Sequence, residues 1–223
     1  MTDTTATLIV IRHGEPAPDG RLTQAGTNEV RATAHVLLSR NLVPDRIVSS
    51  TPPRAGMTTN IIKHILSPDS TVPVQRENLL DMTSHIFNIA DFIKRHRALT
   101  GVTLLSGHAE TMDCFAASLL SPGDCARLFA ILPENRFLRV VDAGIETLRF
   151  LPKCGDAIIM TQATGDNPRY MRDVVDDWTL SGYIADGAFI TPPDRDLSCK
   201  LTGEKIRRNA PLPALYYQTP HPR

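Results

Sequence analysis

Apolar and polar residues are arranged along most of the chain in a pattern that predicts short buried strands separated by helices. The first apolar run, Leu8 to Ile11, has four consecutive apolar residues, three of them β-branched. Such a run is typical of a strand that is buried on both faces of a parallel sheet. Apolar residues at helical spacing follow from Val30 to Leu38, and Thr23 stands where the helix N-cap is expected. The pattern therefore predicts an α/β fold.

The same alternation continues toward the carboxyl terminus. Further strands, all expected in one sheet with the first, are predicted near Arg46 to Ser49, Val102 to Leu105, Ile145 to Phe150 and Ala157 to Thr161. Helices are expected to begin near Arg54 and Thr111, and another is expected around Ile86 to Arg97.

Three of the predicted strands end in side chains that suit an anion. Arg12 and His13 follow the first strand and precede a turn at Gly14. Arg54 begins the helix after the second strand, and His108 follows a later strand. Carboxyl ends of parallel strands meet at one edge of a sheet, and helix N-termini attract anions. We therefore expect these arginines and histidines to converge on one phosphate-sized pocket.

Four short motifs surround these side chains. They are RHGE at Arg12 to Glu15, LTxxG at Leu22 to Gly26, SSTPPRAGMT at Ser49 to Thr58, and SGH at Ser106 to His108. Together they resemble the histidine phosphatase superfamily, also called the phosphoglycerate mutase-like family, over roughly Thr7 to Met171. The resemblance implies a three-layer α/β sandwich with a mainly parallel central sheet, a phosphohistidine intermediate, and no metal or other cofactor.

The resemblance also implies a role for each pocket residue. His13 would be the nucleophile, and His108 would be the second histidine of the pocket. Arg12 and Arg54 would clamp the phosphate. These residue types suit that chemistry, because a phosphoryl group in transfer carries negative charge that fixed cationic donors stabilise, while a neutral imidazole is a nucleophile near neutral pH. No acidic cluster has metal-ligand spacing, and the acidic stretch from Asp173 to Asp177 is interpreted as a solvated helix face.

The motifs leave open which carboxylate gives a proton to the leaving group. The family takes this proton from a residue between the second arginine and the second histidine, so the candidates are Asp81 and Glu77. Asp81 fits the family's Leu-x-Glu pattern through Leu79, although it is an aspartate where glutamate is usual. Glu77 is the alternative acid. Glu110, which follows His108 closely, is a third candidate and is interpreted as solvated.

Composition sets the limits within which these motifs act. A chain of 223 residues that is 42% apolar can bury one substantial core. Its 24 basic and 24 acidic residues give no net electrostatic reason to bind nucleic acid or an anionic membrane. The chain has no long apolar run and no signal peptide pattern, so a cytoplasmic location is expected. The four cysteines lack CxxC spacing, which indicates neither a zinc site nor a redox dithiol.

The pattern of strands and helices changes near Met171. We expect a catalytic domain over residues 1–172 and an appendage rich in proline and glycine over residues 173–223. Such an appendage could be a disordered tail, an arm over the active site, or an element exchanged in a homodimer. Its aromatic residues favour packing over full disorder.

Two functions from different classes follow. The short segment between Arg54 and His108 leaves no room for a large lid, and in this the chain is similar to the short bacterial phosphohistidine phosphatases. The favoured prediction is a metal-independent phosphatase that acts on a phosphorylated small molecule or a phosphoprotein. The alternative is a non-catalytic relative that binds phosphate or a protein partner.

Overall fold

The computed structural model describes residues 6–69, 71–81, 92, 101–142, 145–162 and 178–193. The strands are β1 (Ala6–Arg12), β2 (Arg46–Ser49), β3 (Val74–Arg76), β4 (Val102–Gly107), β5 (Phe137–Asp142), β6 (Ile145–Phe150), β7 (Ala157–Gln162), β8 (Trp178–Ala185) and β9 (Ala188–Ile190). The helices are α1 (Gln24–Ser39), α2 (Pro53–Leu66), α4 (Ala109–Leu119) and α5 (Pro122–Ile131), with short 3₁₀ turns η1 (Asn78–Leu80) and η2 (Glu134–Arg136).

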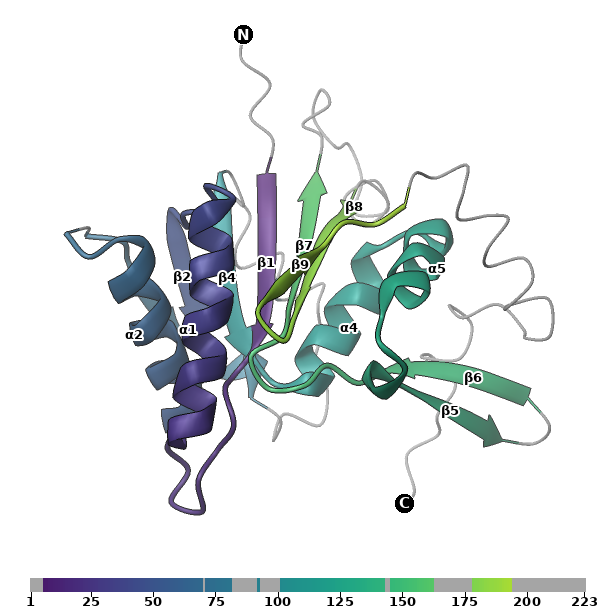
Figure 1. Cartoon of the computed structure of the whole chain (residues 1–223), viewed down its shortest axis with the longest axis horizontal. Helices are drawn as coiled ribbons and strands as arrows, with labels where there is room; N and C mark the ends of the chain where they lie inside the picture. Colours follow the sequence, from purple (N-terminus) through teal and green to yellow (C-terminus); the bar gives the residue numbers. More distant parts are fainter. Residues whose placement is uncertain are drawn as a thin grey trace, which may run out of the picture.

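Seven strands form one sheet in the order β3-β2-β4-β1-β7-β8-β9 (Figure 1). The three pairings among β3, β2, β4 and β1 are parallel, and the three that involve β7, β8 and β9 are antiparallel. The α/β class is confirmed, but the expectation of a mainly parallel sheet is wrong, because half of the pairings are antiparallel. The cause is local: the segment before β7 is hydrogen-bonded to the carboxyl end of β1, so β7 starts there and runs back along β1.

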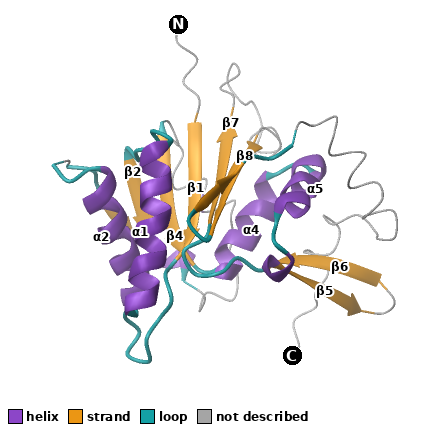
Figure 2. Cartoon of the chain, in the orientation of Figure 1, coloured by secondary structure: helices purple, strands orange, loops and turns teal. Residues whose placement is uncertain are grey.

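Helices cover both faces of this sheet (Figures 1 and 2). Successive residues of β1 point to opposite faces, as the pleat of a strand requires. Ile9 and Ile11 pack in one apolar cluster with residues of α1 and α2, whereas Leu8 and Val10 pack in another with residues of α4 and α5. All four side chains are fully buried, which confirms the predicted strand with two buried faces.

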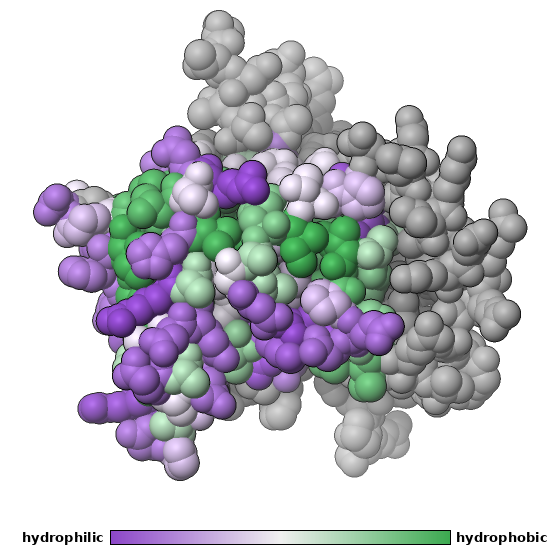
Figure 3. All heavy atoms as spheres, viewed as in Figure 1, coloured by the Kyte–Doolittle hydropathy of each residue, from purple (hydrophilic) through white to green (hydrophobic). Residues whose placement is uncertain are grey.

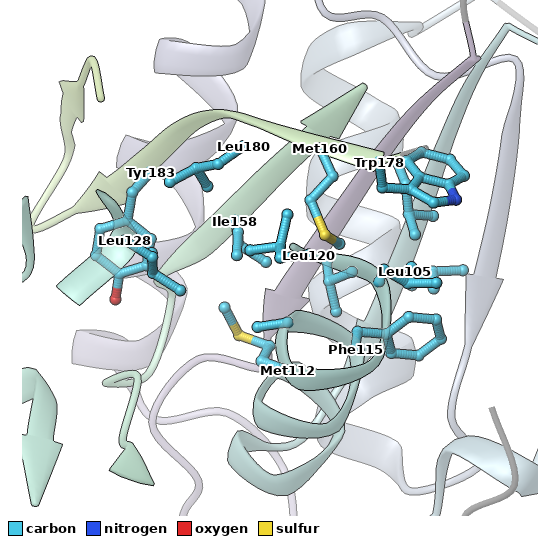
Figure 4. Packing of buried hydrophobic residues seen from close by; sticks show 14 of the residues in the cluster. Leu105, Met112, Phe115, Leu120, Leu128, Ile158, Met160, Trp178, Leu180 and Tyr183 are labelled. Carbon is cyan, nitrogen blue, oxygen red and sulfur yellow. The ribbon is translucent and has the colours of Figure 1, made fainter. Parts of the chain in front are cut away.

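The cluster on the α4 and α5 side unites distant parts of the sequence. In Figure 4, Met112 and Phe115 of α4 lie close to Leu105 of β4 and to Met160 of β7. Trp178 of β8 belongs to the same cluster. Strands from both ends of the chain therefore share one core with the helix that follows His108.

The strand predicted at Ile145–Phe150 forms, but its predicted place is wrong. β6 pairs antiparallel with β5 in a separate hairpin, which projects to the right in Figure 1. Periodicity identifies a strand without identifying its partner. Here the partner is the adjacent strand in sequence, while the edge of β1 that remained open is occupied by β7. The other four predicted strands share the main sheet, and the helices begin close to Thr23, Arg54 and Thr111 as expected.

Part of the segment predicted to be an appendage belongs to the sheet. β8 pairs with β7, β9 pairs with β8, and the side chains of Trp178 and Tyr183 are buried. The boundary predicted at residue 172 and the acidic stretch from Asp173 to Asp177 lie outside the described residues, as does nearly all of the helix predicted at Ile86 to Arg97.

The surface in Figure 3 divides by hydropathy. Hydrophobic residues form a band across the upper half of this view, and hydrophilic residues dominate the lower half, toward which β1 and β4 direct their carboxyl ends. None of the helices in the described part of the chain is long and apolar enough to cross a membrane. Of the described cysteines, Cys125 and Cys154 are free thiols, and Cys114 forms no disulfide bond.

Candidate active site

Two glycines bring the end of β1 against the start of α1. A Cβ atom on Gly14 would lie 2.3 Å from the carbonyl oxygen of Gly26, and one on Gly26 would lie 2.4 Å from backbone atoms of Glu15. Side chains do not tolerate such distances, so both positions require glycine. Thr23 caps α1 by accepting a hydrogen bond from the Gly26 amide at 2.9 Å, as predicted. The RHGE and LTxxG motifs therefore contribute the two backbone segments that lie in close contact here.

His13 follows β1, and each of its two ring nitrogens makes a hydrogen bond. Its Nδ1 lies 2.8 Å from the carbonyl oxygen of Gly14, which can only accept a hydrogen bond, so Nδ1 carries the proton. Its Nε2 accepts a hydrogen bond from Nε of Arg54 at 2.9 Å. Burial lowers the pKa of His13 to about 4; the hydrogen bond to Gly14 opposes this shift, and the charges of Arg54 and Arg12 add to it. At neutral pH the ring is uncharged, with its lone pair on Nε2.

His108 lies beside His13, with ring centroids 5.0 Å apart. Nη2 of Arg54 approaches Nδ1 of His108 at 3.5 Å, and since a guanidinium only donates, Nδ1 accepts and Nε2 holds the proton. That Nε2 faces the hydroxyl of buried Ser50 at 3.3 Å. Burial is the main cause that lowers the pKa of His108 to about 4, with His13 and Arg54 adding to it and Asp81 opposing it.

Arg54 is held by its place at the start of α2. Pro53 occupies the first turn, where the fixed backbone angle of proline suits a helix and its missing N–H is not needed. The hydroxyl of Thr58 donates to the carbonyl oxygen of Arg54 at 2.9 Å and accepts from the Gly14 amide at 3.3 Å. This double contact ties α2 to the turn that follows His13, so the SSTPPRAGMT motif positions Arg54 against both histidines.

Arg12 completes the group of cations. Its Nη1 donates to the carbonyl oxygen of Pro152 at 2.6 Å, while its Nε is buried and has no hydrogen-bond partner in the described residues. Its charge also contributes to the lowered pKa values of His13 and His108. A buried guanidinium N–H without a hydrogen-bond partner is costly, so Nε of Arg12 keeps an unused capacity to donate.

The candidate acids occupy three different environments. Asp81 is partly buried at the end of η1, where both carboxylate oxygens accept hydrogen bonds from Thr51. Glu77 is 6% exposed and caps η1 by accepting from the Leu79 amide at 3.1 Å. Glu110 is exposed in the first turn of α4. Of these, Asp81 is the one whose charge acts on His108.

The site therefore brings together Arg12, His13, Arg54 and His108, and among the candidate acids Asp81 is the one whose charge acts on His108. Their catalytic roles remain predictions. Sequence reasoning did not assign a role to Ser50 or Thr51, although both stand inside the motif that carries Arg54. Within the described residues, no group of three or more His, Cys, Asp or Glu side chains could hold a metal ion.

Comparison with solved structures identifies the fold that carries this site. No protein-family model and no curated protein matches the sequence. A provisionally assigned phosphohistidine phosphatase SixA from Agrobacterium tumefaciens matches with a TM-score of 0.57 and 18% identity, over 81% of this chain and 98% of that one. The chain has the histidine phosphatase fold.

Other solved structures with this fold agree. A provisionally assigned SixA from Nakamurella multipartitia gives a TM-score of 0.55 at 18% identity and covers 84% of this chain and 96% of that one. The protein histidine phosphatase SixA in complex with tungstate gives 0.55 at 14% identity and covers 80% and 96%. The resemblance predicted from the motifs is thus confirmed for the fold, which spans nearly the whole length of these neighbours.

Proposed function

We propose that this chain is a phosphatase of the histidine phosphatase type, which carries the phosphoryl group on Nε2 of His13. The observation that supports this most directly is the pair of contacts on the His13 ring. The Gly14 carbonyl holds the proton on Nδ1, and Nε2 meets Arg54 beside His108. The names of the structural neighbours also favour a phosphatase, and one of them binds tungstate, an oxyanion that resembles phosphate in shape.

In the first step, Nε2 of His13 attacks phosphorus as the bond from phosphorus to the leaving atom breaks. The guanidinium of Arg54 exchanges its hydrogen bond to Nε2 for one to a phosphate oxygen, which frees the lone pair for attack. Arg12 donates to another oxygen, and the two guanidinium groups stabilise the charge that the oxygens share. His108, whose Nε2 proton faces Ser50, packs beside the His13 ring. The leaving atom takes the electron pair of the broken bond, and Asp81 gives it a proton.

In the second step, water attacks phosphorus and the bond from phosphorus to Nε2 breaks. The electron pair of that bond returns to Nε2 of His13, and the Asp81 carboxylate accepts a proton from the attacking water. Inorganic phosphate leaves, and both side chains return to their starting protonation states. The arginines provide the positive charge throughout, so no step requires a metal ion.

The substrate is a phosphorylated small molecule or a phosphoprotein. Asp81 rather than Glu77 is proposed as the acid, because the Glu77 carboxylate is used to cap η1 while Asp81 acts on His108. Transfer of a phosphoryl group from nitrogen needs less help from an acid than transfer from an alkyl oxygen, because the leaving nitrogen is protonated more easily.

The test is to trap the intermediate. Wild-type protein given radiolabelled p-nitrophenyl phosphate and quenched in base should carry label that survives base and is released by acid, as phosphohistidine is. His13→Ala should carry none, while His35→Ala, at an exposed histidine on α1, should be labelled like wild type. Binding of phosphate without label or turnover in the wild-type chain would instead favour the non-catalytic relative.

A further inference from the structure

Asp81 is held by one residue at both of its oxygens. The backbone N–H of Thr51 donates to Oδ1 at 2.7 Å, and the Thr51 hydroxyl donates to Oδ2 at short range. Thr51 follows β2 and Asp81 follows η1, so the contact joins two loops at the carboxyl edge of the sheet. The phosphate contacts described above do not require this arrangement.

The Thr51 backbone is itself fixed from the other side. Its carbonyl oxygen accepts a hydrogen bond from Nη1 of Arg76 at 2.9 Å. The Arg76 guanidinium lies against the first turn of α2, where a Cβ on Gly56 would come within 3.1 Å of Nη2. Arg76 therefore ties the Thr51 backbone to the end of β3, beside the first turn of α2.

The loop that carries Asp81 is anchored close to the second histidine. The hydroxyl of Thr111 donates to the carbonyl oxygen of Leu80 at 3.3 Å and accepts from the His108 amide at 3.2 Å. Leu80 directly precedes Asp81, so the carboxylate is tied to the start of α4 by its own backbone and to the start of α2 by Thr51.

A hydroxyl differs from an amide in one respect that matters for an acid. A backbone N–H can only donate, whereas a hydroxyl can donate to an ionised carboxylate or accept from a protonated carboxyl group. Asp81 alternates between these two forms in the proposed cycle. Thr51 can keep a hydrogen bond to the same oxygen in both forms, because only its hydroxyl hydrogen has to turn.

We propose that Thr51 is a positioning residue that keeps the Asp81 carboxyl group in one orientation while it gives up and regains its proton. This inference rests on the proposed function. Before transfer, the hydrogen on Oδ2 of Asp81 is shared between the Thr51 hydroxyl oxygen and the leaving atom. It moves to the leaving atom as that atom takes the electron pair of its bond to phosphorus, and the Thr51 hydroxyl then turns and donates to Oδ2.

The test uses substrates that differ in their need for an acid. Thr51→Val removes the hydroxyl and keeps the N–H and the side-chain shape. It should lower kcat/KM for an alkyl phosphate by about 10- to 100-fold, and that for p-nitrophenyl phosphate by no more than about 3-fold, since a good leaving group needs little protonation. Thr51→Ser should restore the alkyl phosphate rate. Thr71→Val, at an exposed threonine before β3, should leave both rates unchanged.

A double variant tests whether Thr51 acts through Asp81. Thr51→Val combined with Asp81→Asn should be no slower on the alkyl phosphate than Asp81→Asn alone, because the same group has already been lost. Losses that multiply would overturn the inference, and so would equal losses on both substrates. Thr51→Ala, read in the same way, replaces the valine variant should that fail to fold.

Different results would contradict the proposed function and the role of Thr51. A wild-type chain that hydrolyses neither substrate and forms no phosphoenzyme contradicts the proposed function. A wild-type chain that hydrolyses both, with Thr51→Val giving the wild-type ratio of rates, contradicts only the role of Thr51.

Discussion

At the scale of residues, the chemistry of His13 and His108 depends on which ring nitrogen carries the proton. The carbonyl of Gly14 holds the proton of His13 on Nδ1, and Arg54 holds that of His108 on Nε2. The two rings are therefore in different tautomers although their lowered pKa values are alike. His13 has its lone pair on Nε2 beside Arg54, which suits attack, whereas the Nε2 proton of His108 faces the Ser50 hydroxyl.

Removal of the proposed nucleophile, His13, should abolish turnover while the fold survives. His13→Ala should lower kcat for p-nitrophenyl phosphate by roughly 10⁴-fold or more, because the covalent route is lost. Circular dichroism and thermal unfolding should remain close to wild type. A residual rate within tenfold of wild type would contradict the assignment of His13 as nucleophile.

The pH dependence follows from the lowered pKa values of the two histidines. The unfolded chain takes up these protons near pH 6.5, whereas the folded chain takes them up near pH 4. Between these values the unfolded state binds more protons, so the free energy of unfolding should fall as the pH decreases, by up to about 1.4 kcal/mol per pH unit for each histidine. His13 should stay neutral and nucleophilic down to about pH 5.

Urea denaturation at several pH values checks the stability side of this prediction. The wild-type chain should lose stability between pH 6.5 and 4, and His13→Ala should lose less, because one of the two groups is gone. NMR titration of the His13 ring checks the pKa directly. A midpoint near 6.5 in the folded protein would contradict the prediction.

At the scale of elements, the close approach of β1 and α1 requires glycine at positions 14 and 26. Gly26→Ala would place a Cβ 2.4 Å from the backbone of Glu15, and the two elements would have to move apart. We expect a loss of about 1–3 kcal/mol in the free energy of unfolding, together with lower activity, because the same contact aligns His13. Denaturation in urea measures the first effect and p-nitrophenyl phosphate turnover the second.

Gly123 is the matched control. It also lies in the first turn of a helix, α5, but the nearest atom to an added Cβ is the Ser121 hydroxyl at 3.8 Å. Gly123→Ala should therefore be neutral, or stabilising by up to about 1 kcal/mol, since alanine favours helix over glycine. Equal destabilisation by both substitutions would show that the contact at Gly26 has no special importance.

The elements also show what a sequence can and cannot predict here. The strand at Leu8–Ile11 and the arginine and histidines at strand ends were predictable, because burial and chemistry leave a signal in a few consecutive residues. The partner of β6 was not, because pairing depends on which sheet edge is open. The hydrogen bonds from Thr51 to Asp81 were not predictable either, since they depend on how two loops that are distant in sequence meet. The Gly14 to Gly26 contact left a signal only in its spacing.

At the scale of the whole molecule, one charge network centred on buried Arg136 connects the hairpin, the sheet and Arg12. Arg136, fully buried at the base of the hairpin, contacts Asp156 at 2.6 Å and Asp186 at 2.8 Å. Asp156 also accepts from the hydroxyl of Tyr183 at 2.6 Å. Its backbone carbonyl accepts from the Arg12 amide at 3.0 Å, so the network reaches the end of β1.

Loss of the buried Asp156 carboxylate should therefore lower the free energy of unfolding. Asp156→Asn removes the buried carboxylate beside the buried Arg136 guanidinium and leaves it the exposed Asp186 carboxylate, so we expect a loss of about 3–5 kcal/mol in the free energy of unfolding. Asp186 contacts the same guanidinium, but its side chain is 73% exposed, and Asp186→Asn should cost less than about 1 kcal/mol. Urea denaturation of the two variants compares them, and equal losses would contradict the importance of burial.

The hydrogen bond from Arg12 to the Pro152 carbonyl has a consequence for the order of events during synthesis. All four side chains of the pocket have left the ribosome once β4 and the first residue after it have emerged, but the carbonyl that orients Arg12 belongs to a segment made later. The edge of β1 that β7 covers is also still bare at that stage. A nascent chain therefore carries the proposed nucleophile, His13, before the contact that orients Arg12 has formed, and we expect hydrolysis to begin only when the last strands have joined the sheet.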